Sequence, residues 1–140
     1  MASDIDDLVR QVEFPDDYDQ ASEALIELVS LDPGTGARVA LKVLQDDIGD
    51  VFLRGFAFDL LYRADQAAAV ELIEQSARTC EPHVFAEMLT EVAADEALAA
   101  ESDEVRRAVA SLRSALKART AGDLEEISGS VDMFFEAYGR

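Results

Sequence analysis

Apolar residues recur every three or four positions along most of the chain, a spacing typical of amphipathic helices, and they almost nowhere alternate with polar residues as in a strand. In residues 17–31, one side of the predicted helix carries the apolar set Tyr18, Ala21, Leu25, Leu28 and Val29. Residues 51–62 differ, because apolar side chains cover nearly the whole circumference there. A helix of that kind is normally central, so we expect this segment to lie in the middle of the core.

Capping and turn residues divide the pattern into seven to eight helices. We predict helices over residues 3–13, 17–31, 37–45, 51–62, 66–78, 82–99, 103–119 and 123–138. Residue types that favour the N-cap position stand at Ser3, Asp65, Ser102 and Asp123. Residues 32–36 read as a turn before the third helix, and residues 128–130 as a break or kink in the last one.

These elements predict an all-α fold, arranged as a compact stack of antiparallel helix pairs; an orthogonal bundle is the alternative. The length of 140 residues predicts a single helical domain over residues 1–140. Gly55 lies inside a predicted helix, where it costs about 1 kcal/mol relative to Ala, so we expect a neighbouring helix to cross closely there. Asp59 and Arg63 stand four residues apart, as an acid–base pair that supports this helix.

Three segments begin alike, with an acidic residue followed by a helix that carries small residues and leucines on one stripe. They begin at Asp32, Asp50 and Asp103, and the third continues with Val105-Arg106. This pattern resembles the HEAT-repeat family over about a third of the chain. The starts are 18 and 53 residues apart, whereas HEAT repeats have one constant period of roughly 40 residues. The resemblance therefore implies a compact HEAT-like domain rather than a regular solenoid.

The net charge of the chain limits the classes of binding partner that we expect. The chain has 30 acidic and 12 basic residues, for a formal net charge of −18, while its 49% hydrophobic content argues against disorder. A folded protein this acidic repels phosphate backbones and anionic lipid headgroups. We therefore expect neither nucleic acid nor membrane as a partner, and favour a protein with a basic surface.

The compartment follows from what the sequence lacks. Residues 1–13 contain four acidic residues and no apolar run, unlike a signal peptide, and no stretch approaches the roughly 18 uninterrupted apolar residues of a membrane span. The single cysteine, Cys80, cannot form a disulfide within the chain. We predict a cytoplasmic protein with a reduced thiol; a reactive thiol is the sharper alternative.

The candidates for chemistry are few. His83, Glu87 and Glu91 lie at helical spacing and could present an imidazole and two carboxylates to a metal. There is no second histidine, and carboxylates alone are nonspecific ligands in so acidic a chain, so we interpret these residues as a solvated helix face. Residues 34–36 lack both the Gly-Lys-Ser/Thr ending of a P-loop and a strand before it. We therefore predict no catalytic residues, no metal site and no cofactor, and interpret the protein as a non-enzyme.

Acidic residues gather toward the N-terminus, where residues 1–50 hold 13 of the 30 acids beside three bases. We predict that two clusters at helix ends and turns form a partner-binding surface: Asp16, Asp17, Asp19, Asp46, Asp47 and Asp50. The plainer interpretation is a solvated surface that gives solubility and salt tolerance. If these residues are instead helix caps, reversing their charge should unfold the protein rather than only abolish binding.

A small acidic helical protein of this kind looks like the bacterial immunity proteins, which neutralise toxins delivered by contact-dependent or secretion systems and include HEAT-like and helical families. This resemblance of class implies a tight one-to-one complex in which an acidic face covers a basic active site, as in a nuclease, with electrostatically steered association. Two alternatives are an acidic adaptor or chaperone, and a scaffold domain in a homo-oligomer. The apolar face of Phe134, Phe135 and Tyr138 would favour the scaffold if it lay open, and otherwise forms a lid over the last helix pair.

Overall fold

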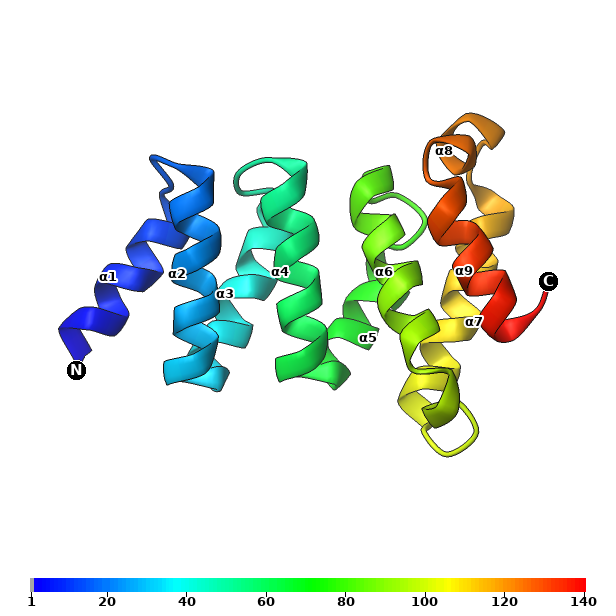
Figure 1. Ribbon diagram of the computed structural model, residues 1–140, viewed down its shortest axis with the longest axis horizontal. Coiled ribbons are helices and arrows are strands. Elements are labelled where there is room, and N and C mark those ends of the chain that lie inside the picture. Colours follow the sequence, from blue (N-terminus) through cyan, green and yellow to red (C-terminus); the bar gives the residue numbers. More distant parts are fainter. Residues whose placement is uncertain (1) are drawn as a thin grey trace. The chain divides into compact units, whose positions relative to one another are not determined.

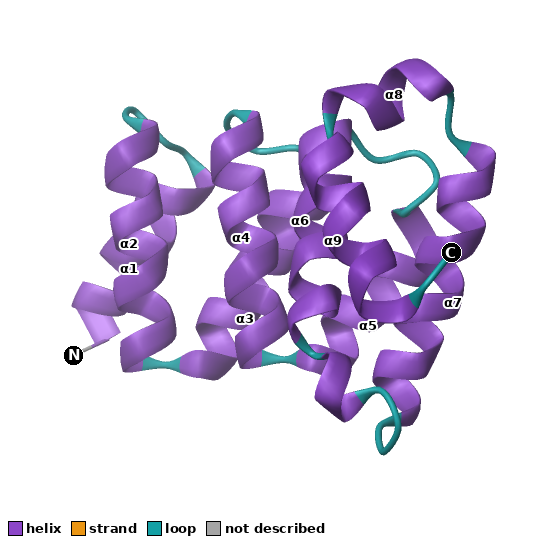
Figure 2. Ribbon diagram, turned by 45° about the vertical axis from the view of Figure 1, so that its right-hand side comes forward, coloured by secondary structure: helices purple, strands orange, loops and turns teal. Residues whose placement is uncertain are grey.

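The computed structural model describes residues 2–140, with side chains from Asp4 onward. Within this range the chain is all-α and contains no strand, so the predicted fold class is confirmed (Figures 1 and 2). The α-helices are α1 (Ala2–Glu13), α2 (Tyr18–Leu31), α3 (Pro33–Gln45), α4 (Val51–Ala64), α5 (Gln66–Ser76), α6 (Pro82–Ala94), α7 (Asp103–Ala118), α8 (Ala121–Glu126) and α9 (Ser128–Tyr138). The chain divides into two compact units, Met1–Ala68 and Ala69–Arg140. The single domain predicted from the length stays a prediction.

Short polar side chains fix most of the helix starts, because they accept the backbone N–H groups that the first turn leaves unpaired. Asp50 Oδ1 accepts the Leu53 N–H at 2.8 Å, and Ser102 Oγ accepts the Val105 N–H at 3.2 Å. The same role falls to Asp17, Asp32, Asp65 and Thr120. The caps predicted at Asp65 and Ser102 are therefore confirmed.

Other predicted boundaries were wrong by a few residues. Thr120, not Asp123, caps α8, because its hydroxyl accepts the Asp123 N–H at 3.2 Å. Ser3 lies inside α1. Residues 33–36 form the first turn of α3, with Pro33 at its start, and not a turn before it. The last predicted helix is two helices separated at Ile127, one residue before the expected break.

In the first unit, α2 and α4 lie side by side in front of α3 (Figure 1), and each of the three packs against the other two. Phe58 of α4 is the largest fully buried side chain in this core. One side of α4 is buried, as its apolar sequence predicts, but Phe52 on the other side is 77% exposed. The expectation that α4 is enclosed by the core is therefore correct for one side only.

The backbones of α2 and α3 approach each other closely at Gly36. A Cβ atom on this glycine would lie 2.5 Å from Val29 Cγ2 and 2.7 Å from Val29 Cα, closer than packed atoms come. Glycine is therefore required at this position for α3 to pack at this distance from α2. Gly55, where we expected such a crossing, is buried within α4.

In the second unit, α6 packs against α7, α8 and α9. Phe85 of α6 and Phe134 of α9 are fully buried, and the Tyr138 hydroxyl donates a hydrogen bond to the Val92 carbonyl at 2.5 Å. The aromatic face of α9 is therefore turned onto α6. This is the lid arrangement, and it removes the open apolar face that would have favoured a scaffold role.

Candidate partner-binding surface

The two predicted acidic clusters lie in two connections of the first unit. Asp16 and Asp17 precede α2 and Asp19 stands in its first turn, while Asp46 and Asp47 follow α3. Asp50 directly precedes α4. The α1–α2 and α3–α4 connections lie at the same end of this unit, the upper end in Figure 1. The fold thus brings together clusters that are some 30 residues apart in sequence, and we call residues 14–19 and 46–52 the loop end.

The six predicted acids have different structural roles within the loop end. Asp17 Oδ1 accepts the N–H groups of Asp19 at 2.9 Å and Gln20 at 3.3 Å, and Asp50 caps α4. These two carboxylates therefore cap helices, which is the alternative role that the sequence left open for the clusters. Asp16 and Asp46 are exposed and stand outside the helices, so they are the acids best placed to meet a partner.

Asp47 occupies a position that usually belongs to glycine. Its φ is +51°, and the Ile48 N–H donates to the Val43 carbonyl at 3.0 Å, which closes α3 in a Schellman motif. A non-glycine residue in this left-handed region is strained, by roughly 1 kcal/mol, although aspartate tolerates it better than most. The exposed carboxylate of Asp47 is thus held at some expense of stability.

Arg54 of α4 holds the backbone of the α3–α4 connection in place. Its Nη1 donates to the Gly49 carbonyl at 2.6 Å and to the Asp47 carbonyl at 3.1 Å. Gly49 has a φ of +75°, which this turn requires. Because the backbone is held at two carbonyls, the Asp46–Asp47 side chains are presented from a fixed turn.

Large aromatic side chains are exposed at the same end of the unit. Phe14 in the α1–α2 connection is 72% exposed, Phe52 in the first turn of α4 is 77% exposed, and Tyr18 at the start of α2 is 45% exposed. None of these exposures was predicted from the sequence. Tyr18 lies on the apolar stripe of α2, as predicted, but the expectation that this stripe is buried is wrong at Tyr18. The exposure of Phe14 could have been predicted, because Phe14 stands before Pro15 and outside any helical stripe.

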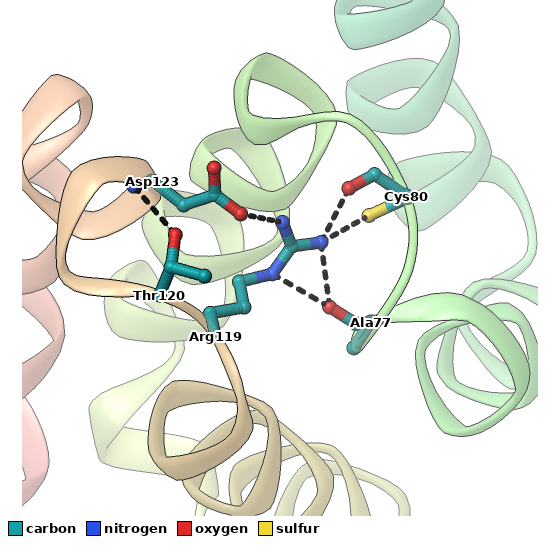
Figure 3. A network of polar contacts seen from close by, with 5 residues as sticks. All are labelled: Ala77, Cys80, Arg119, Thr120 and Asp123. Atoms are coloured by element: carbon teal, nitrogen blue, oxygen red, sulfur yellow. Dashed lines mark hydrogen bonds and ion pairs between the residues drawn. The ribbon is translucent and has the colours of Figure 1, made fainter.

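The thiol of Cys80 lies in a different setting, in the second unit (Figure 3). Arg119 Nη2 donates to the Cys80 carbonyl at 2.5 Å and contacts Cys80 Sγ at 3.4 Å, and its guanidinium also donates to the Ala77 carbonyl. Burial raises the pKa of the Cys80 thiol to about 11, and the positive charge of Arg119 offsets only part of this rise. The thiol is therefore protonated at neutral pH, which argues against a nucleophilic role.

His83 contacts the second unit's α8 instead of a set of metal ligands. Its Nε2 lies 3.8 Å from Oε1 of Glu126. Among the residues that the structure describes, no group of three or more His, Cys, Asp or Glu side chains is placed to hold a metal ion. The arrangement of His83, Glu87 and Glu91 proposed from helical spacing is thus not assembled as a metal centre.

A shallow cleft of about 280 Å³ lies at the other end of the first unit, between the start of α3 and the end of α4. Its charged lining residues are Arg38 and Asp65, and the Asp65 carboxylate caps α5. The rest of the lining is mostly apolar: Pro33, Gly34, Ala37, Leu41, Leu61, Ala64 and Ala68. This cleft lies away from the predicted acids, so the loop end is the stronger candidate site.

Comparisons of the chain with protein-family models, curated proteins and solved structures found no match. Over residues 2–140, helices fall short of the length and apolar character that crossing a membrane requires.

Proposed function

We propose that this chain is an acidic protein-binding module whose loop end holds a partner protein with a basic surface. The observation that carries the proposal is the exposure of Phe14 and Phe52 beside Asp16, Asp46 and Asp47. A few well-packed residues, many of them aromatic, supply most of the binding energy at protein interfaces, and charged residues around them select the partner and speed its approach. A surface kept only for solubility needs the acids but gains nothing from the exposed aromatics.

The most specific form of this function is an immunity protein that acts in the bacterial cytoplasm. It would bind a cognate toxin one to one and cover a basic active site, as in a nuclease, so that the toxin's nucleic acid substrate is excluded. The net charge of −18 supports fast, electrostatically steered association with such a partner. The strained Asp47 supports it too, because a carboxylate kept where glycine is more stable indicates a role outside folding.

The alternative form is an acidic adaptor or chaperone for another protein. It uses the same surface, but binds several clients more loosely and loses them as salt is raised. A scaffold role in a homo-oligomer is less supported, because the aromatic face of α9 packs onto α6.

The first experiment is affinity purification of the tagged protein from its native cells, with mass spectrometry of what survives a high-salt wash. The recovered partner is then titrated against wild type and two double variants with equal charge change. Asp16→Lys/Asp46→Lys alters the loop end without removing a side chain that caps a helix, because Asp46 ends α3 through its backbone N–H alone. This variant should weaken binding roughly tenfold or more. Glu125→Lys/Asp132→Lys alters exposed acids of the second unit and should leave the affinity nearly unchanged.

Thermal melts of both double variants separate binding from folding. A loss of affinity with an unchanged melting temperature supports the loop end as the site. Equal loss in both variants would show a non-specific charge effect and contradict the proposal.

Growth assays distinguish the two forms of the function. An immunity protein predicts that the partner alone arrests growth and that co-expression of this chain restores it, whereas Asp16→Lys/Asp46→Lys fails to restore it. A partner that is harmless when expressed alone favours the adaptor.

A further inference from the structure

The outward side of α2 carries a row of acids. Asp19, Glu23 and Glu27 are spaced four residues apart, and all three are exposed. Like charges at this spacing repel each other along a helix and disfavour it by a few tenths of a kcal/mol per pair. Asp19 stands in the first turn, where the helix dipole favours an acid, but Glu23 and Glu27 repel each other and add no stability to α2. These two acids therefore indicate a role outside the helix.

The outward side of α4 carries an apolar row at the same spacing. Phe52 is 77% exposed, and Phe56 and Leu60, one and two turns further on, are half-buried. The opposite side of the helix supplies Phe58 and Leu61 to the core. Ile26 of α2, which is 48% exposed, adds a second apolar element beside the acidic row.

The two rows are neighbours in the fold. Helices α2 and α4 pack against each other, and both begin at the loop end, so they run in the same direction (Figure 1). Each row covers nine residues, whose ends lie roughly 12 Å apart along the helix axis. Acids and apolar side chains thus form two parallel strips, which we call the α2–α4 face: Asp19, Glu23, Ile26, Glu27, Phe52, Phe56 and Leu60.

We propose that the α2–α4 face binds a basic amphipathic helix of the partner protein. The apolar side of that helix would lie on the α4 row, and its Lys or Arg residues, at i, i+4 and i+8, would meet the acids of α2 at matching intervals. This inference rests on the proposed function and names the part of the partner that is recognised.

Charge complementarity selects this occupant over a second copy of the chain. A second copy brings a further net charge of −18 to a face whose polar row is already acidic. A basic helix instead neutralises the row and covers Phe52 and Ile26 in the same contact.

The test uses two synthetic 18-residue peptides of identical composition, made of Leu, Lys, Ala and Gln with a fluorescent label. In one peptide the Leu and Lys residues form two adjacent helical stripes; in the other the order is scrambled so that no stripe exists. Fluorescence anisotropy at 0.15 M salt should show that the full-length protein binds the striped peptide roughly tenfold or more tightly than the scrambled one. Circular dichroism should show that the striped peptide gains helix on binding.

Substitutions locate the contact. Ile26→Ser/Phe52→Ser should remove the preference for the striped peptide, and Glu23→Lys/Glu27→Lys should weaken its binding by a similar factor. Leu98→Ser/Met133→Ser is the matched control, since it removes exposed apolar side chains from the second unit and should change nothing. Equal affinity for both peptides, or equal loss in the control, would overturn the inference.

Two further results separate this inference from the function on which it rests. If light scattering shows a dimer that Phe52→Ser dissociates, a second copy covers the face and the inference is wrong. If the partner protein still requires Asp16 and Asp46 but ignores Ile26→Ser/Phe52→Ser, the loop end is the site and only the helix inference fails.

Discussion

At the scale of single residues, Arg119 shows how this acidic chain uses one of its few cations inside the fold. Only 3% of its side chain is exposed, and it donates to the carbonyls of Ala77 and Cys80 (Figure 3). Its guanidinium carbon also lies 4.3 Å from the centroid of the Phe85 ring, and its Nη1 lies 3.4 Å from Oδ2 of Asp123. The planar fork of arginine makes all these contacts at once, which a lysine cannot.

We predict that Arg119→Lys lowers the free energy of unfolding by about 2 to 4 kcal/mol, because the ammonium group leaves buried carbonyls without donors. Urea denaturation followed by circular dichroism measures the change. Arg10→Lys is the control, since the Arg10 side chain is 73% exposed and its ion pair with Asp7 spans 3.9 Å. An Arg119→Lys variant as stable as the control would show that the network contributes little.

The thiol of Cys80, beside Arg119, makes stability and thiol reactivity depend on pH. Its pKa is raised from 9.0 to about 11 in the fold, mainly by burial, so the fold favours the protonated form. The stability this contributes is present below pH 9 and is lost as the pH rises from 9 through 11. At pH 8 we therefore expect Cys80 to react with iodoacetamide at least about 100-fold more slowly in the native protein than in urea. Equal rates would contradict this.

At this scale, the sequence predicts the features that depend only on local geometry, such as helix caps. The caps at Asp65 and Ser102 were predictable, because a side chain that meets an N–H three residues on needs no tertiary information. The exposure of Tyr18 was not, because its place on the apolar stripe is correct and only the packing of α2 decides which part of that stripe is covered. Arg119 was missed for the same reason: its acceptors lie 39 and 42 residues away.

At the scale of elements, helix identity was predictable and the closeness of two helices was not. The 3.6-residue period identifies α2 and α3, but Gly34 and Gly36 look alike in sequence and were both assigned to a turn. In the fold both lie in α3, and only Gly36 faces the backbone of another helix.

Substituting each of these glycines by alanine tests the contact. Gly36→Ala places a Cβ atom 2.7 Å from Val29 Cα, so α2 and α3 must separate, and we expect a loss of about 1 to 3 kcal/mol in unfolding free energy. Gly34→Ala meets its nearest atom, Asp32 Oδ1, at 3.6 Å and should instead stabilise by about 0.5 kcal/mol by restricting the unfolded chain. Thermal and urea denaturation of the pair measure both. Effects of the same sign would contradict the close approach.

At the scale of the whole molecule, composition alone supports an expectation about the partner, whereas the division into compact units requires the fold. The expectation that nucleic acid is not a partner rests on net charge, which is a property of composition and requires no structure. The division at Ala68 is invisible in the sequence, because it falls within the continuous helix α5 and no linker marks it.

That continuous helix predicts how the units unfold. Breaking α5 at Ala68 would forfeit its cooperativity, so we expect one unfolding transition for the whole chain, as a single domain requires. Phe58→Ala in the first unit and Phe134→Ala in the second each remove a fully buried ring and should each cost about 3 to 5 kcal/mol.

Thermal melts give the melting temperature of each variant, and hydrogen exchange resolved by mass spectrometry gives the exchange rates of each unit separately. If the chain is one cooperative domain, either substitution lowers one shared melting temperature and speeds exchange in the most protected helices of both units, because their amides then exchange through the same global unfolding. If each variant instead shifts only its own unit and the melt splits in two, the chain is two domains. In that case the loop end and the α2–α4 face would belong to a 68-residue module, and binding should survive Phe134→Ala at temperatures where the second unit is already unfolded.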